Sequence, residues 1–313
     1  MRRTIEASTR GLNLYLKQSQ LVISMNNEVL DRIPFEDIGV LILGSTGVTV
    51  SSGVFKAIAD AGGAILSCDD KFKPSGLFLP LHSNGLHSER LRFQSDASVP
   101  LKKNIWARIV TAKITNQAHL LAGSPKQFGL FNIATRVKSG HSTRKEAQAA
   151  RIYWSEIFSK FELENDISFT RHRYGPTPNN LLNYGYAVLR TATARALCCA
   201  GLHPVIGVHH RNRYSEFCLA DDVMEPYRPF VDKAVLDLVK NGEFEITKET
   251  KVKLIEVLQH TIKTGNGTGP LAHSLERCAS SLATCFEKSS KEKLPVNESV
   301  KSLALPEWPE KSN

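Results

Sequence analysis

Three short segments of the chain carry side chains that can bind a divalent cation. They contain Glu146, the pair His209 and His210, and the acidic residues Asp222 and Glu225. Carboxylate oxygens suit Mg²⁺ and Mn²⁺, and imidazole suits transition metals and proton transfer near neutral pH. Each segment also has a simpler structural interpretation, so none of the three is specific by itself.

Glu146 lies in a segment with helical spacing. Thr143 precedes it by three residues, which is a capping-box pattern, so the carboxylate can simply stabilise the start of a helix. On a helix, however, Ala150, Tyr153 and Ile157 share the face of Glu146, and the carboxylate would then point toward an apolar seam. A carboxylate directed inward needs a partner such as a metal ion or an arginine. On spacing alone, the cap is the favoured interpretation.

His209 and His210 follow a short β-prone run, residues 205–208, after a glycine that can end a helix. A histidine at such a turn is commonly a hydrogen-bonded surface group. Adjacent side chains of an extended segment face opposite ways, so we expect at most one of the two rings to serve a given site.

Asp222 and Glu225 are three residues apart, which places both carboxylates on one face of a helical turn. Acidic residues at a helix start complement its dipole, and Pro226 fits a first turn, so a purely structural role is a strong alternative. The same arrangement presents oxygen ligands to Mg²⁺ or Mn²⁺, with water and substrate phosphate completing the coordination.

The composition is that of a globular protein with about two domains. The chain has 313 residues, of which 42% are hydrophobic and 23% charged. No apolar run reaches the roughly 20 residues that span a bilayer, and no apolar segment typical of a signal peptide follows the basic start. We therefore expect a cytoplasmic protein without a membrane segment. The six cysteines form no C-x-x-C pair, which argues against a disulfide framework or a zinc cage.

The net charge of +9 is concentrated in the middle of the chain. Residues 1–100 are neutral, residues 101–213 carry 17 basic against five acidic side chains, and residues 214–313 have a net charge of −3. A positive field concentrated in this way suits a polyanion such as nucleic acid. A solubilising surface is the alternative for scattered lysines.

The hydrophobic pattern predicts a β-rich beginning and a helical remainder. Short apolar runs alternate with turns up to about residue 81, and Asn26-Asn27 is typical of a hairpin turn. Helical spacing begins near Lys102, so we place a boundary in the polar stretch 87–101. We predict an α+β chain in three parts: a β-rich domain over residues 1–95, a helical domain over residues 96–288, and a loosely attached, flexible tail over residues 289–313.

Taken in order, the three segments resemble the CRISPR-associated integrases that insert new spacers, in their short, type II-like form. The resemblance rests on Glu146, Ile-Gly-Val-His-His at 206–210 and Asp-Val-Met-Glu-Pro-Tyr-Arg-Pro at 222–229. It extends to Arg3-Thr4-Ile5, Cys68-Asp69-Asp70, residues 76–81, residues 183–190 and residues 201–204. It covers nearly the whole chain up to about residue 288.

The resemblance implies an N-terminal β-sandwich-like domain and a larger C-terminal all-α catalytic domain. It implies a catalytic Mg²⁺ or Mn²⁺ site held by Glu146, His210 and Glu225, with Asp222 as an auxiliary acid. Glu225 stands where many relatives have Asp. The implied activity is that of a metal-dependent DNA endonuclease and integrase, in which the 3′-hydroxyl of a captured DNA fragment attacks a phosphodiester of the CRISPR repeat.

The resemblance also implies macromolecular partners. These are double-stranded DNA with single-stranded 3′ ends, CRISPR repeat DNA, a second copy of the chain, the small second adaptation protein and, in type II systems, the effector nuclease. Candidate DNA-binding side chains are basic or aromatic: Arg151, Arg171, Arg173, Arg211 and Arg213, and for base stacking Tyr153, Trp154 and Tyr184. For the three aromatic residues, a place in the hydrophobic core is the favoured alternative.

Two further hypotheses compete with this function. The first is a DNA-binding architectural subunit without catalysis, and the second is a metal-dependent hydrolase of small phosphoesters. The neutral N-terminal domain is expected to serve assembly. Its apolar runs Ile38–Leu43 and Ala64–Leu66 are either wholly internal or form a sheet that meets a second copy.

Overall fold

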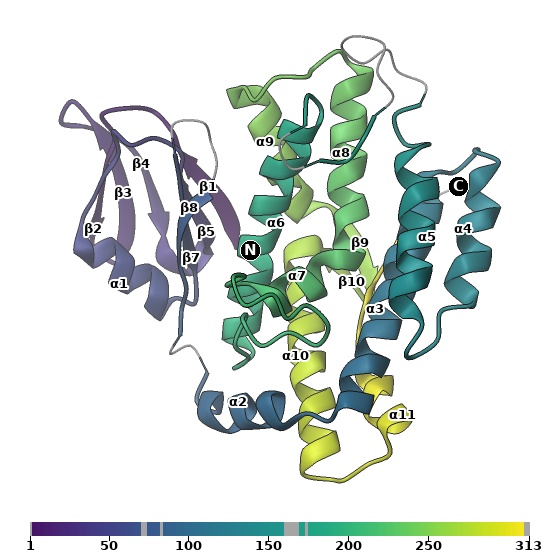
Figure 1. Cartoon of the computed structure of the whole chain (residues 1–313). Helices are drawn as coiled ribbons and strands as arrows, with labels where there is room; N and C mark the ends of the chain where they lie inside the picture. Colours follow the sequence, from purple (N-terminus) through teal and green to yellow (C-terminus); the bar gives the residue numbers. More distant parts are fainter. Residues whose placement is uncertain (1, 70–73, 82–83, 160–168, 173–174, 310–313) are drawn as a thin grey trace.

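The computed structural model describes residues 2–69, 74–81, 84–159, 169–172 and 175–309. A β-rich N-terminal part stands beside a larger, mainly helical part (Figure 1). This mixed α+β architecture agrees with the fold class predicted from the hydrophobic pattern.

Two four-stranded sheets build the N-terminal part, one in the order β1-β5-β7-β8 and the other in the order β4-β3-β2-β6. The strands are β1 (Arg3–Ala7), β2 (Asn13–Lys17), β3 (Gln20–Met25), β4 (Glu28–Pro34), β5 (Ile38–Leu43), β6 (Thr49–Val50), β7 (Ala64–Cys68) and β8 (Pro74–Phe78). A 3₁₀ turn, η1 (Phe35–Asp37), precedes β5, and helix α1 (Ser52–Asp60) packs against β2 and β7. Apolar side chains of both sheets and of α1 share one core.

Local sequence signals explain the turns of this part. Asn26 and Asn27 join β3 to β4 with φ values of 51° and 65°, as a two-residue hairpin turn requires, so the predicted hairpin is confirmed. Gly62, at φ +69°, follows the end of α1. Strand β5 pairs with β1 on one side and β7 on the other, and β7 pairs with β5 and β8. The runs Ile38–Leu43 and Ala64–Leu66 are therefore internal to their sheet, and their edges are not available to a second copy.

The second part is built mainly from helices. They are α2 (His87–Asp96), α3 (Val99–Leu120), α4 (Lys126–Thr135), α5 (Ser142–Trp154), α6 (Asn179–Cys199), α7 (Cys218–Met224), α8 (Arg228–Lys240), α9 (Lys248–Glu256), α10 (Leu271–Ser290) and α11 (Val296–Ser299), with 3₁₀ turns η3 (Glu225–Tyr227), η4 (Val257–Gln259) and η5 (Val300–Ser302). Helix α6 is buried over most of its length and packs against α7, α8, α9, α10 and β7. Helix α3 packs against α4, α5, α7, α8 and η3, so it reaches the elements that carry both predicted glutamates.

The prediction of an all-α second domain is wrong in one respect. A small sheet in the order β10-β9-β11 lies in this part, with strands β9 (Thr261–Thr264), β10 (Gly267–Pro270) and β11 (Pro306–Glu307). The turn between β9 and β10 uses Gly265 at a φ of +56°, a conformation that glycine adopts readily.

The prediction of a flexible tail is also wrong for residues up to 309. Val300 and Leu303 are buried, and the guanidinium of Arg108 donates hydrogen bonds to both of their carbonyls. The ring of Trp308 stacks on Phe230 with centroids 4.8 Å apart. These few apolar side chains attach a segment whose composition is otherwise polar. Residues 310–313 lie outside the described part of the chain.

The polar stretch 87–101, predicted as a boundary, forms α2 and the start of α3 and belongs to the second part. Gln94 on α2 is fully buried, and its side-chain amide bonds the backbone of His203 in both directions and the carbonyl of Ile206. The amide thereby fixes the segment that leads to the two histidines.

A buried ion pair between Glu6 on β1 and Lys251 on α9, at 2.5 Å, links the sheets to the helices. In the part of the chain that the structure describes, no helix combines the length and apolar character needed to cross a membrane.

Candidate metal centre

The two predicted glutamates lie on either side of one lysine. Lys113 on α3 places its Nζ 2.7 Å from Oε1 of Glu146 on α5 and 2.6 Å from Oε2 of Glu225 at the start of η3. Helix α5 begins after His141, so Thr143 lies within the helix and forms no cap with Glu146. The capping interpretation of Glu146 is therefore wrong, and the partner that its inward direction requires is Lys113.

Glu225 is more deeply buried than Glu146, whose side chain is 20% exposed. Its other oxygen, Oε1, lies 2.9 Å from Nε of Arg228, and its side chain is only 8% exposed. Burial alone would raise the pKa of Glu225, but the two cations Arg228 and Lys113 outweigh it and lower the pKa to about 2. The carboxylate is therefore ionised at neutral pH and carries a full negative charge in the site.

His210 is held by Asp222, a carboxylate with no exposed surface. The Asp222 side chain accepts hydrogen bonds from the backbone N–H groups of Val208, His209 and His210 at 2.8, 2.9 and 3.2 Å. Its Oδ1 also lies 2.6 Å from Nδ1 of His210, and this hydrogen bond, opposed by burial, raises the pKa of the imidazole. The carboxylate thus fixes both the backbone turn and the orientation of the ring.

The same turn replaces the short strand expected over residues 205–208, which the structure describes as bends and turns. Three consecutive N–H groups converge on one carboxylate, which an extended strand does not allow. Gly207 is required at this point, because a Cβ there would lie 2.4 Å from the carbonyl oxygen of His210 and 3.0 Å from Oδ2 of Asp222.

His209 has a different environment from His210. Its ring stacks on Trp106 of α3, with centroids 4.2 Å apart and planes 4° from parallel, and burial lowers its pKa. The His210 ring meets Trp106 edge-on at 5.7 Å. Since both rings pack around one indole, the expectation that adjacent histidines face opposite ways is wrong for this turn. The His209 ring therefore packs against the indole. The His210 ring is held by Asp222 through Nδ1, which leaves its other nitrogen, Nε2, for another partner.

Arg228 contacts a buried network formed by two tyrosines and Asp232. Its guanidinium lies 4.5 Å from the ring centroid of Tyr186, whose hydroxyl donates to Asp232. Tyr153, which is two turns after Glu146 on α5, donates to the same carboxylate at 2.6 Å. Burial raises the pKa of Asp232 to about 6 despite these donors and the nearby arginines. The network joins α5, which carries Glu146, to α6 and to α8, which begins three residues after Glu225.

The donor types fit a divalent cation, although the spacing is that of a site filled by an ammonium group. Two carboxylates and an imidazole that a buried carboxylate orients through Nδ1 form a common ligand set for Mg²⁺ or Mn²⁺ chemistry. Among the described residues, no three His, Cys, Asp or Glu side chains stand close enough together to hold an ion directly. The Lys113 ammonium between Glu146 and Glu225 accounts for that spacing, and it shows that these oxygens attract positive charge.

Asp222 does not have the role predicted for it as an auxiliary ligand. Its two oxygens are occupied by four donors and it has no exposed surface, so it positions His210 instead. The neighbouring Asp221 pairs with Nε of Arg190 at 2.7 Å and lies on the outer face of α7.

Sequence reasoning missed two cations of the site, Lys113 and Arg228. Arg228 follows Glu225 by three residues, a spacing at which an ion pair is expected on a helical turn. Lys113 is flanked on α3 by the buried side chains of Val110 and Ile114, so a lysine in an apolar helical pattern was the available signal.

The predicted DNA-binding residues have different surroundings. Arg151, Arg211 and Arg213 are exposed, and the loop that carries the last two also exposes Tyr214, whose side chain Arg213 contacts. Arg171 is partly buried and donates to the side chains of Asn179 and Asn183. Arg173 lies outside the described residues.

Stacking on DNA bases by Tyr184 is a wrong prediction, because that ring is only 4% exposed and belongs to the helical core. Tyr153 is fully buried, and Trp154 is partly buried against the same core. The core interpretation of these aromatic residues is therefore confirmed.

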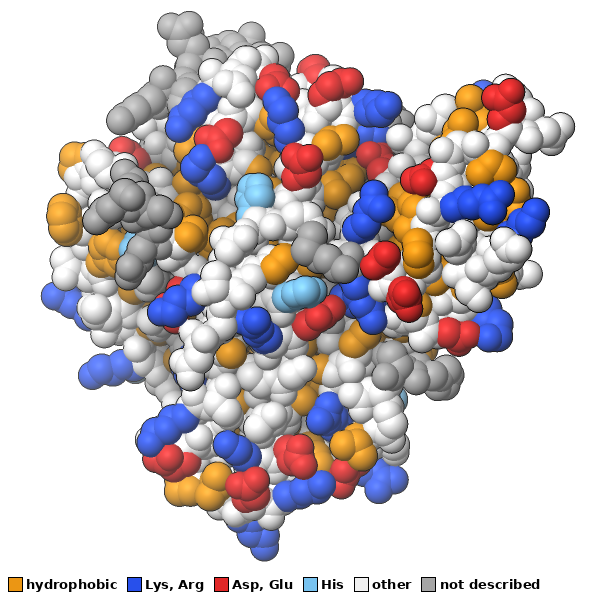
Figure 2. All heavy atoms as spheres, turned by 180° about the vertical axis from the view of Figure 1, so that it is seen from behind, with side chains coloured by type: hydrophobic (Ala, Val, Ile, Leu, Met, Phe, Trp, Pro, Cys, Tyr) orange, Lys and Arg blue, Asp and Glu red, His pale blue; other side chains and the backbone are white. Residues whose placement is uncertain are grey.

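Figure 2 shows one face of the molecule on which Lys and Arg alternate with Asp and Glu, so the positive charge on that face is locally compensated.

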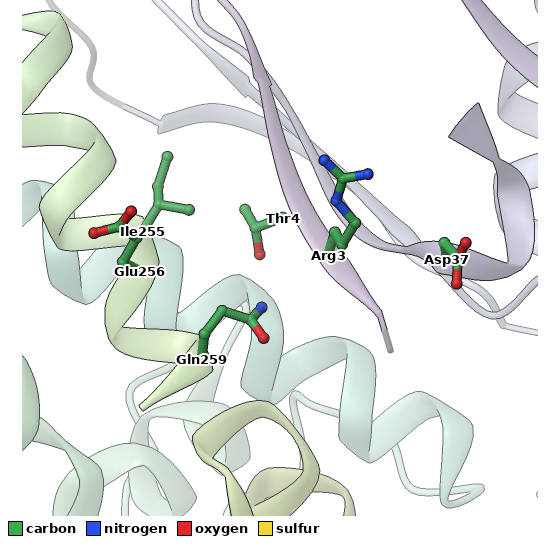
Figure 3. Close-up of a pocket in the computed structure, with 6 residues that line it drawn as sticks. All are labelled: Arg3, Thr4, Asp37, Ile255, Glu256 and Gln259. Carbon is green, nitrogen blue, oxygen red and sulfur yellow. The ribbon is translucent and has the colours of Figure 1, made fainter. Parts of the chain in front are cut away.

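Two surface cavities lie away from these residues. One, of about 480 Å³, opens between β1 and α9, and Figure 3 shows its lining: Arg3, Thr4, Asp37, Ile255, Glu256 and Gln259. The other, of about 840 Å³, runs between α3 and the C-terminal segment that ends at Trp308. Neither of these two cavities is lined by Glu146, His210 or Glu225.

The fold is shared with several solved structures. A casposase bound to integration product superimposes with a TM-score of 0.76 at 20% identity, over 95% of this chain and 93% of that one. A Cas1 protein from Thermotoga maritima gives a TM-score of 0.66 at 18% identity, over 91% and 97% of the two chains. A chain of a complex of Cas6-RT-Cas1 with Cas2 gives 0.75 at 18% identity, over 96% of this chain and 36% of that one. The architecture is therefore one found in CRISPR-associated proteins and casposases.

Sequence comparison identifies the family. The family model described as CRISPR associated protein Cas1 matches residues 7–261. The CRISPR-associated endonuclease Cas1 of Neisseria meningitidis serogroup C is 34% identical over 304 residues, which cover 95% of this chain and 93% of that relative. The chain belongs to the Cas1 family, as the resemblance of its motifs implies.

Proposed function

We propose that the chain is a divalent-metal-dependent DNA endonuclease and integrase that inserts captured DNA fragments into a CRISPR array as new spacers. The observation that carries the proposal is the convergence of Glu146 and Glu225, 79 positions apart in the sequence, on one cation, with His210 anchored nearby. Membership of a family whose relatives are named endonucleases, and a fold shared with a casposase bound to integration product, support the same activity.

The reaction proposed is a phosphodiester exchange. The 3′-oxygen of the fragment forms a bond to a phosphorus atom of the repeat, the bond from that phosphorus to its original 3′-oxygen breaks, and the departing strand leaves as a 3′-hydroxyl. A bound Mg²⁺ or Mn²⁺ supplies charge stabilisation at the phosphate and lowers the pKa of the attacking hydroxyl. Glu146, Glu225 and His210 would hold that ion.

The chain's own residues prepare the site for this exchange. Asp222 can only accept at Nδ1 of His210, so the neutral ring carries its proton there and Nε2 keeps the lone pair needed by a metal ligand or a base. Arg228 keeps Glu225 ionised, and its contact with Tyr186 fixes the arginine in place. The longer arm of Glu225, compared with the aspartate of many relatives, reaches the site from η3.

DNA binding and assembly are the second component of the proposal. The exposed loop with Arg211, Arg213 and Tyr214 follows His210 directly, so it can contact phosphates and unpaired bases next to the reacting end. The proposed partners are DNA with single-stranded 3′ ends, CRISPR repeat DNA, a second copy of the chain, the small second adaptation protein and, in type II systems, the effector nuclease, with the cytoplasm as the site of action. A structure that contains Cas1 together with Cas2 supports the small partner.

An architectural DNA-binding subunit is a second candidate function, and Lys113 is the observation that favours it. An ammonium group that pairs with both glutamates is the arrangement expected of a centre that has lost its metal. The two candidates differ in one property: only the integrase needs a divalent ion to join DNA.

An integration assay tests the proposal. The purified chain is combined with its small partner, a supercoiled plasmid that carries the repeat, and a fragment with labelled ends. With Mn²⁺ or Mg²⁺ we expect label to appear in the plasmid, and we expect none with EDTA or with a fragment whose ends are 3′-deoxy. Joining that persists with 3′-deoxy ends would contradict the proposed nucleophile, and DNA binding without joining would favour the architectural subunit.

A further inference from the structure

Lys113 is the unusual member of the candidate centre, because it is a nearly buried cation that no ligand set requires. Its side chain is 13% exposed, and it projects from α3 next to the fully buried Val110 and Ile114. The hydrogen bond to Glu146 and the ion pair with Glu225 occupy one oxygen of each carboxylate. The ammonium therefore holds together two acidic groups that come from different elements.

A divalent ion would need the same oxygens. Mg²⁺ and Mn²⁺ bind carboxylate oxygens directly, and a cation placed between Glu146 and Glu225 would lie within a few ångströms of the ammonium of Lys113. Two positive charges at such a short separation repel each other strongly in a poorly hydrated site. The ion and the ammonium therefore cannot both occupy this position.

The two cations of the centre differ in their freedom to move. Arg228 contacts Tyr186 through its planar group and lies beside the buried Asp232 network, so it is fixed on its inner side. Lys113 carries its charge at the end of a flexible four-carbon stem, and its ammonium contacts the two carboxylates. Of the two, Lys113 is the cation that an incoming ion can displace.

We propose that Lys113 is a tethered competitor of the divalent ion: its ammonium holds Glu146 and Glu225 together in the metal-free chain and leaves them when the ion binds. This inference rests on the proposed function, because it takes these residues to be the metal site. Lys113 is thus a positioning residue that sets the metal affinity of the centre.

Calorimetric titration of the full-length, metal-free chain with Mn²⁺ tests the proposal. Replacement of Lys113 by Gln removes the competing charge, so we expect the K113Q variant to bind Mn²⁺ about tenfold more tightly than the wild type. K113Q should also melt at a lower temperature in EDTA and gain more thermal stability from Mn²⁺ than the wild type does, because the ion then replaces a missing partner. Lys103→Gln, at an exposed position on the same helix, removes the same charge and should leave the affinity for Mn²⁺ unchanged.

Lys113→Arg provides a second variant in case K113Q does not fold. The guanidinium keeps the charge and can bind both carboxylates through several donors, so K113R should bind Mn²⁺ more weakly than the wild type. Affinity in K113Q that is equal to or weaker than that of the wild type, or affinity in K113R that is equal or tighter, would overturn the proposal.

Glu146→Gln separates this inference from the proposed function. If Mn²⁺ binds the wild type and E146Q abolishes that binding, the metal site stands and the Lys113 variants decide the role of the lysine. If E146Q binds Mn²⁺ as the wild type does, Glu146 is not a metal ligand, and the competition model and the proposed catalytic centre are both wrong.

Discussion

Replacement of Asp222 by Asn is expected to disable the centre without touching a proposed metal ligand. The carboxylate accepts four hydrogen bonds, two at Oδ2 from the backbone of Val208 and His209 and two at Oδ1 from the backbone and ring of His210. An Asn side chain can keep one oxygen toward the first pair. Its NH₂ group then faces the two His210 donors, which loses both of those bonds.

The cost follows from these two bonds. A hydrogen bond to a charged group contributes about 1.5–3 kcal/mol, and the partial exposure of the His210 ring reduces its share because water can replace the lost acceptor. We therefore expect Asp222→Asn to lower the free energy of unfolding by about 3 kcal/mol. In a chain of this size that corresponds to a decrease in Tm of roughly 5 °C.

Thermal unfolding followed by circular dichroism measures this cost, with Asp221→Asn as the matched control. Asp221 is partly exposed and pairs with a partly exposed arginine, so its replacement should cost at most about 1 kcal/mol. Equal Tm values for the two variants would refute the positioning role of Asp222.

The pH dependence gives a second check on Asp222. Because the hydrogen bond to Asp222 raises the pKa of His210 above its ordinary value of 6.5, the protonated ring stabilises the fold. That contribution is complete below pH 6.5 and is lost as the pH rises through the raised pKa. The His210 part of the difference between wild type and Asp222→Asn should therefore shrink above neutral pH, and NMR titration should show a lower His210 pKa in the variant.

Three further predictions follow from the surroundings of single residues. His210→Ala should abolish strand transfer, whereas His209→Ala should reduce it less because that ring stacks on an indole; the opposite order in an integration assay would reassign the ligand. The affinity for a duplex with single-stranded ends should fall steeply with salt, by roughly 0.9 in log K per decade of salt concentration for each phosphate neutralised. In a filter-binding titration, the double replacement of Arg211 and Arg213 by Ala should reduce that slope by up to about two. Tyr184→Phe removes a buried hydroxyl that makes no hydrogen bond among the described residues, so it should leave both stability and DNA affinity unchanged within about 1 kcal/mol, and a loss of affinity would show that the hydroxyl takes part in DNA binding.

Much of the fold is predictable from local sequence signals. These signals affect only the few residues around them. They are the Asn26-Asn27 turn, the glycine that follows α1 and the change to helical spacing near residue 102. The errors concern long-range contacts. The sequence of α2 is polar and is therefore interpreted as a boundary. One of its polar side chains, Gln94, is buried and donates a hydrogen bond to a segment more than a hundred residues away. The tail is held by Val300 and Leu303, two apolar residues in a polar composition, through an arginine on α3.

The site was predictable in its residue types but not in its electrostatics. Glu146, His210 and Glu225 could be named from motif resemblance, and the structure brings the two glutamates together. Their common partner, Lys113, belongs to no motif, and only the packing of α3 against α5 and η3 reveals it. The position of Asp222 also depends on tertiary structure, since periodicity cannot distinguish a carboxylate that binds an ion from one that encloses a backbone turn.

Cleavage of a branched DNA that mimics the integration product is the most direct test of the metal centre, because it needs only the purified chain. We expect the wild type to resolve the branch in Mn²⁺ and not in EDTA, and we expect Glu225→Gln to retain DNA binding but to lose resolution by more than about a hundredfold. Resolution by Glu225→Gln at the wild-type rate, or branch cleavage by the wild type in EDTA, would contradict a metal centre built on Glu146, His210 and Glu225.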